Sequence, residues 1–155
     1  MRLHELITRP EQIVTDLAAV DRWSAINELL AVLVKTAGIE PRHAAAVATA
    51  VREREQTMST GIGHGIGIPH AATDHVDRVQ AVLGVARHDI DFAALDSAPV
   101  RIVLLFVVPQ NQFQAHLDTL ANIARLLSHE ATRARVRAAT EPEEVLAAIR
   151  EHSAD

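Results

Sequence analysis

The sequence has no cysteine and no tyrosine, and only one tryptophan and three phenylalanines among its 155 residues. Without cysteine, the chain can form no disulfide, no thiolate nucleophile and no cysteine-ligated zinc site. With so few aromatic rings, its core must consist mainly of aliphatic side chains, and a chain of this length buries enough surface to form one. We therefore expect a single domain over residues 1–155 with an aliphatic core.

Basic residues are also few, since 15 Lys and Arg face 20 Asp and Glu and the formal net charge is −5. A protein that binds nucleic acid generally needs a basic face to displace counterions, so nucleic acid is not an expected partner. One short basic run contains Arg133, Arg135 and Arg137. We interpret it as the solvated face of a helix.

Long hydrophobic runs are missing as well. The longest apolar run covers residues 102–108, far short of the ~20 residues that span a bilayer. The N-terminus lacks the apolar segment of a signal peptide. We expect a soluble, cytoplasmic protein that does not insert into a membrane.

The pattern of apolar residues indicates strands that alternate with helices. Strands are expected at residues 13–15, 79–87 and 100–108, and helices at residues 21–37 (with Asp21 as N-cap and Gly38 as terminator), 41–55 and 112–128, with a last helix starting near Pro142. The strand at 100–108 is apolar on both faces, which is typical of the centre of a sheet covered on both sides. The order of elements predicts an α/β fold with a mixed, mostly parallel central sheet and helices on both faces, in a single domain.

The helix at residues 112–128 is expected to bury one stripe of apolar side chains, because these recur at helical spacing. The stripe comprises Phe113, Leu117, Leu120, Ala124 and Leu127.

Glycine is scarce too, yet four of the six glycines lie within residues 61–67, in the segment TGIGHGIGIPHA. The plainest interpretation is a connection rich in turns. A second is a phosphate cradle, since glycine lets successive N–H groups converge on an anion. The spacing Gly-x-Gly-x-Gly-x-Gly, however, matches no nucleotide motif, and no Gly-Lys-Ser/Thr follows.

A third interpretation is a metal site, because His64, His70 and His75 cluster near Asp74 and Asp77. Their spacing matches no common zinc pattern. We expect neither a metal nor a cofactor.

Several short motifs, taken in order, resemble one known family. They are Arg54-Glu55, Ser59-Thr60, the segment GIGHGIGIPHA and, later, AHLDTLANIARLL. Together they resemble the fructose/mannitol-type (type 2) enzyme IIA domain of the bacterial phosphotransferase system, which includes the stand-alone nitrogen-regulatory IIA proteins. The resemblance covers nearly the whole chain, so residues 1–155 are expected to form one domain of this type. The combined pattern R-E-x4-T-G-I-G-x-G-I-x-I-P-H is far more specific than any of its parts.

The resemblance implies that His70 accepts a phosphoryl group from an HPr-type phosphocarrier protein or its nitrogen-branch relative. The group then passes to a IIB domain, or the protein signals to a regulatory target by its phosphorylation state. A neutral imidazole suits this chemistry because it is nucleophilic near pH 7. We expect His70 to be exposed at the end of a rigid element, with the glycines letting backbone approach the phosphoryl oxygens.

The resemblance also assigns three supporting residues. His116 corresponds to a second histidine that helps hold the phosphoryl group or orient the nucleophile; alternatively it is a packing histidine. Arg54 is expected to bind phosphoryl oxygens, or instead to complement the end of a helix. Thr60 is expected to bind phosphate or to cap the loop.

Two positions depart from the family. His64 stands where asparagine is common, and it could alter the pKa of His70 or be an innocent surface change. Gly67 stands where alanine is usual and is expected to make the segment before Pro69 more flexible. The leading expectation is a cytoplasmic phosphocarrier of the regulatory IIA type. The alternatives are a sugar-transport IIA of the fructose/mannitol class and a regulatory binding module that is never phosphorylated.

Overall fold

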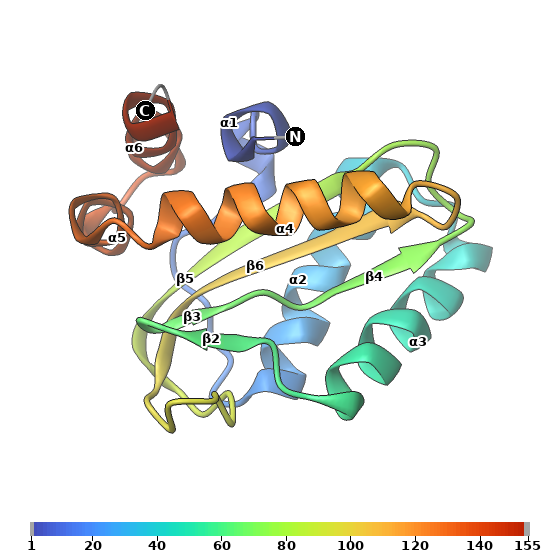
Figure 1. The fold of residues 1–155 in the computed structure, drawn as a ribbon, viewed down its shortest axis with the longest axis horizontal. Coiled ribbons are helices and arrows are strands. Elements are labelled where there is room, and N and C mark those ends of the chain that lie inside the picture. Colours follow the sequence, from blue (N-terminus) through green and yellow to red (C-terminus); the bar gives the residue numbers. More distant parts are fainter. Residues whose placement is uncertain (1, 154–155) are drawn as a thin grey trace.

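The computed structural model describes residues 2–153, and Figure 1 shows one twisted sheet with helices on both faces. The six strands are β1 (Ile13–Val14), β2 (Gly61–Gly63), β3 (Ile66–Gly67), β4 (His70–Thr73), β5 (Gln80–Ile90) and β6 (Val100–Pro109). Their order is β1-β5-β6-β3-β2, and β4 pairs with β6 further along the edge that β3 occupies. The β1–β5, β3–β6 and β4–β6 pairs are parallel, whereas β2–β3 and β5–β6 are antiparallel. The predicted mixed, mostly parallel sheet is confirmed.

Helices cover the two faces of this sheet separately. They are α1 (Leu3–Leu6), α2 (Arg22–Ala37), α3 (Pro41–Thr57), α4 (Phe113–Leu127), α5 (Glu130–Ala138) and α6 (Pro142–Ser153), with a 3-10 turn at Pro10–Gln12. One face packs against α2 and α3, and the other packs against α1, α4, α5 and α6. Strand β6 supplies side chains to both cores: Leu104 and Phe106 face α4, and Leu105 and Val107 face α2. The prediction of a central strand buried on both faces is therefore confirmed.

Local signals set the ends of α2 as expected. The Asp21 side chain accepts a hydrogen bond from the Ser24 backbone N–H, which is the N-cap arrangement. Gly38 adopts the left-handed conformation with φ of 67° and ends the helix.

The stripe predicted for α4 is wrong at Leu117, which is 44% exposed, whereas Leu120 packs against the core as expected. Thr119, Ile123 and Leu126, which were not in the predicted stripe, are buried. Leu127 is buried as expected, and the Phe113 side chain lies outside the described ones. Both sets of positions fit helical spacing, so only packing against the strands decides which set is buried.

The glycine-rich segment is a β-hairpin formed by β2 and β3. Gly63 and Gly65 have φ of 97° and 76°, a conformation that L side chains rarely adopt. A Cβ atom at Gly61 would lie 2.6 Å from the Cβ of Ala94, and one at Gly67 would lie 2.8 Å from the ring of Phe92. The expected turn is present at residues 63–65, but the residues on either side of it form strands β2 and β3, which were not predicted. The expectation that Gly67 adds flexibility is wrong because Gly67 is packed tightly in the core.

Within residues 2–153, none of the helices combines the length and the hydrophobicity needed to cross a lipid bilayer.

Candidate functional site

His70 begins strand β4 and is largely buried, with only 5% of its surface exposed. Its register partner on β6 is Phe106, and the two rings stack with centroids 5.1 Å apart and an interplanar angle of 9°. The expectation of an exposed histidine is wrong, because parallel pairing with β6 places the ring on the face of the sheet that α4 covers.

A hydrogen bond fixes the tautomer of the His70 ring. Nδ1 lies 2.8 Å from the carbonyl oxygen of Ile68. A carbonyl oxygen can only accept a hydrogen bond, so Nδ1 must carry the proton. In the neutral ring, Nε2 then holds the free lone pair, and Nε2 is the nucleophilic atom.

Burial and nearby positive charge keep His70 neutral. Loss of solvent lowers its pKa from 6.5 to about 4, and His116 and Arg54 also lower it, although the bond to Ile68 acts in the opposite direction. At neutral pH the imidazole is therefore unprotonated on Nε2.

His116 lies in the first turn of α4 and meets His70 edge to face. The two ring centroids are 4.9 Å apart and the ring planes are at 84°. His116 also approaches the Phe106 ring, at 5.9 Å. Partial burial, followed by the charge of Arg54, lowers the pKa of His116. The structure thus brings the two predicted histidines together, and both are neutral at neutral pH.

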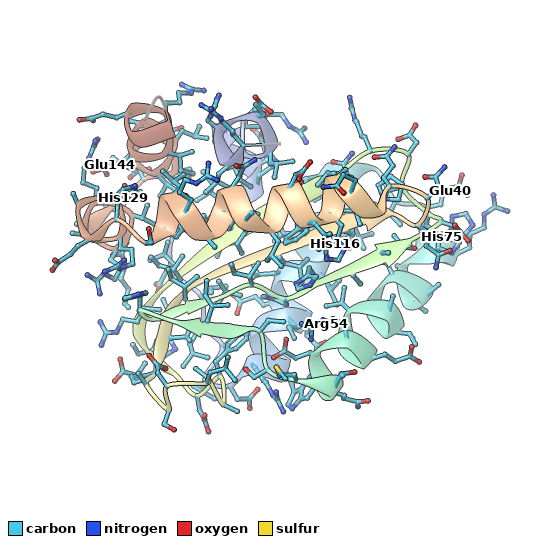
Figure 2. The ribbon with its side chains drawn as sticks, in the orientation of Figure 1. Glu40, Arg54, His75, His116, His129 and Glu144 are labelled. Carbon is cyan, nitrogen blue, oxygen red and sulfur yellow. The ribbon has the colours of Figure 1, made fainter. Side chains whose placement is uncertain are left out.

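Arg54 lies in the last turn of α3, and its Nη1 donates to the carbonyl oxygen of Met58 at 3.0 Å. This bond satisfies a carbonyl at the helix end, as the alternative interpretation expected. Its charge also lowers the pKa of both His70 and His116. In Figure 2, β4 runs between α3, which carries Arg54, and α4, which carries His116. The charge of the guanidinium therefore acts on both histidines, and its contact with phosphoryl oxygens stays a prediction.

Thr60 is buried, and its hydroxyl donates to Oε2 of Glu55 at 2.6 Å. The Thr60 N–H donates to the same carboxylate. The capping interpretation of Thr60 matches this geometry. A contact with phosphate stays a prediction, and it requires the hydroxyl to leave Glu55.

Glu55 is the site residue that the sequence interpretation missed. It is fully buried and accepts from Thr60 and from Arg22, whose Nη1 lies 3.4 Å from Oε1. The sequence contained a signal for the burial of Glu55, because Val47, Val51 and Glu55 recur every four residues. These three residues form the buried face of α3.

The other histidines of the predicted cluster lie elsewhere. His64 is exposed in the hairpin turn with φ of 57°, and His75 stacks on His43 with centroids 4.2 Å apart. Among residues 2–153, no three His, Asp or Glu side chains are grouped so that they could hold a metal ion.

The lowered pKa of His70 predicts that the protein loses stability in mild acid. Between pH 6.5 and about 4, the unfolded chain binds a proton at this position and the folded protein does not, so the free energy of unfolding falls as pH falls. The loss assigned to His70 across this window is about 3 kcal/mol. Urea denaturation across the window should show a shallower pH dependence for His70→Asn than for the wild type. Parallel curves for the two proteins would contradict the prediction.

Comparison with known proteins shows which proteins the chain is similar to. The model of the family described as "Phosphoenolpyruvate-dependent sugar phosphotransferase system, EIIA 2" matches residues 6–152. The chain is 35% identical over 130 residues to a fructose-specific EIIA component of Haloferax volcanii, covering 84% of this chain and 83% of that protein. It is 29% identical over 152 residues to a fructose-specific EIIABC component of Bacillus subtilis; this covers 98% of the chain but only 24% of the relative's length.

Solved structures share the fold. Nitrogen regulatory protein IIA-Ntr from Neisseria meningitidis superposes with a TM-score of 0.85 at 26% identity, covering 95% of this chain and 98% of that one. Enzyme IIAMTL, solved in complex with phosphorylated enzyme IIBMTL from Escherichia coli, superposes with a TM-score of 0.77 at 22% identity, covering 92% and 96%.

Proposed function

Because the chain belongs to the EIIA 2 family of the phosphoenolpyruvate-dependent sugar phosphotransferase system and is a phosphotransfer domain of it, we propose that His70 is its phosphoryl acceptor. The donor is a phosphorylated HPr-type carrier protein, and the reaction takes place in the cytoplasm. One observation carries the assignment: His70 is a neutral histidine whose Nδ1 is held by the Ile68 carbonyl, so that Nε2 keeps its lone pair.

In the proposed reaction, the Nε2 lone pair of His70 forms a bond to phosphorus while the phosphorus–nitrogen bond of the donor phosphohistidine breaks. The electron pair of the broken bond stays on the donor ring. No proton has to move, since Nδ1 of His70 keeps its own. The His70 ring gains positive charge in this step. The Ile68 carbonyl oxygen, which accepts the Nδ1–H bond, stabilises that charge.

The neighbouring residues act on the phosphoryl oxygens. The Arg54 guanidinium supplies positive charge, and the neutral His116 ring can donate one N–H. Thr60 is proposed as a further phosphate contact, once its hydroxyl is released from Glu55. These roles follow from the proximity of Arg54 and His116 to His70 and require no metal.

A regulatory role is the one we favour for this phosphocarrier. It is supported by the TM-score of 0.85 to a nitrogen regulatory IIA, compared with 0.77 to the mannitol enzyme IIA. The target would then be a regulated protein that senses phosphorylation.

Sugar transport is the second candidate, and the 35% identity to a fructose-specific EIIA component favours it. In that case the phosphoryl group passes to a IIB domain. The two roles can be separated by mixing the phosphorylated protein with IIB domains of the fructose and mannitol types. Only a transport component should transfer its phosphoryl group to one of them.

Incubation with phosphoenolpyruvate, enzyme I and HPr tests the proposed function directly. We expect the intact mass to increase by one phosphoryl group, and the group to be lost in acid, as phosphohistidine is. Omission of HPr should abolish the gain. No gain with either HPr or its nitrogen-branch relative would reject phosphoryl transfer and favour a binding module that acts by contacts alone.

A further inference from the structure

Glu55 is a buried carboxylate that joins three elements of the fold. It lies on α3 and accepts hydrogen bonds from Thr60, just before β2, and from Arg22, at the start of α2. Each of these partners is a donor, and Glu55 has no exposed surface. A buried carboxylate without donors would be costly, so these bonds hold the three elements in one arrangement.

Hydrogen bonds continue from Thr60 to the ring of His70. The Ile68 N–H donates to the carbonyl oxygen of Thr60 at 3.0 Å, and this bond closes the base of the β2–β3 hairpin. The carbonyl oxygen of the same Ile68 accepts from Nδ1 of His70 at 2.8 Å. The position of Thr60 therefore determines the position of the Ile68 backbone, and Ile68 in turn orients the imidazole.

We infer that Glu55 is a positioning residue for phosphoryl transfer, acting through Thr60 and Ile68 on His70. The carboxylate holds Thr60, so that the Ile68 carbonyl stays on Nδ1 and the Nε2 lone pair stays directed at the donor. The inference rests on the proposed function of His70. Glu55 itself does not meet the phosphoryl group, because it is fully buried and its oxygens are occupied by Thr60 and Arg22.

The variant Glu55→Gln tests this inference, because it keeps the shape of the side chain but puts an amide N–H₂ in place of one accepting oxygen. A displaced reacting group can cost about 10²-fold in rate, so we expect the maximal rate of transfer from phosphorylated HPr to fall by ~10- to 100-fold. The HPr concentration at half-maximal rate should stay the same, since Glu55 contributes nothing to the surface. Glu53→Gln, an exposed acid on the same helix, is the matched control and should transfer like the wild type.

Nitrogen-15 NMR of the unphosphorylated protein gives the readout that a merely stabilising residue would not change. Wild-type His70 should show a single tautomer with the proton on Nδ1, and Glu55→Gln should show a mixture. A variant that is less stable but keeps the wild-type tautomer and rate would overturn the inference. If the wild type is not phosphorylated but Glu55→Gln still mixes the tautomers, the control of the ring by Glu55 is upheld and the proposed function fails.

Thr60→Val provides a second test if Glu55→Gln does not fold. It removes the hydroxyl bond and keeps the backbone bond to Glu55. The tautomer should again become mixed, and the double variant should show no more of the second tautomer than the single variants, because both changes break the same link. An unchanged tautomer in Thr60→Val would overturn the inference, and a loss of rate without a change of tautomer would belong to the proposed phosphate contact of Thr60 instead.

Discussion

His70→Asn is expected to abolish phosphorylation completely while the protein remains folded. Asparagine keeps an N–H donor for the Ile68 carbonyl but has no ring nitrogen that could attack phosphorus. Loss of the stacking on Phe106 should lower stability without unfolding the chain, since the core is mainly aliphatic and does not depend on this one contact. Intact-mass measurement after incubation with phosphoenolpyruvate, enzyme I and HPr checks the phosphoryl gain, and thermal denaturation checks the fold.

The matched control for this variant is His64→Gln. His64 lies in the adjacent hairpin turn and is exposed, so its variant should be phosphorylated like the wild type. Acid-labile phosphate on His70→Asn would disprove the assignment of the acceptor. In the wild type, nitrogen-15 NMR should place the phosphorus on Nε2; phosphorus on Nδ1 would contradict the tautomer that the Ile68 bond indicates.

His116→Ala is expected to slow phosphoryl transfer by about 10²-fold, the usual effect of removing one preorganised donor to a developing charge. The ring is only partly buried and lies at the start of α4, so thermal stability should change little. Rapid-quench measurement of transfer from phosphorylated HPr gives the rate, and circular dichroism gives the stability.

His129→Ala is the control for the second histidine, because His129 is exposed and lies beyond the far end of α4 (Figure 2). Its transfer rate should equal that of the wild type. A wild-type rate for His116→Ala would show that His116 only packs against Phe106 and takes no part in transfer. A strong loss of stability in the same variant would also favour packing, since a residue that acts on the phosphoryl group need not hold the core together.

Local sequence determined the three long helices α2, α3 and α4 and the strands β1, β5 and β6, but not β2, β3 and β4. Asp21 and Gly38 set the ends of α2 through contacts within a few residues, so their effect could be read from the sequence. The apolar run of β6 required cover on both faces, and this alone placed the strand at the centre of the sheet. The motif around Pro69-His70 identified the family, and a positive φ at two hairpin glycines explains why glycine gathers there.

Only the tertiary structure decided how the site is built. The burial of His70, its stacking on Phe106 and its approach to His116 depend on pairing of β4 with β6 and on packing of α4 over them. The exposure of Leu117 and the burial of the Glu55 carboxylate likewise depend on which face of each helix packs against the rest of the protein. Residues far apart in the chain make these contacts. The spacing of apolar residues shows which faces a helix or strand has, but not which other element packs against each face. For that reason the sequence by itself determined the family, the long helices and three of the strands, whereas strands β2, β3 and β4 and the tautomer and pKa of His70 were decided by packing.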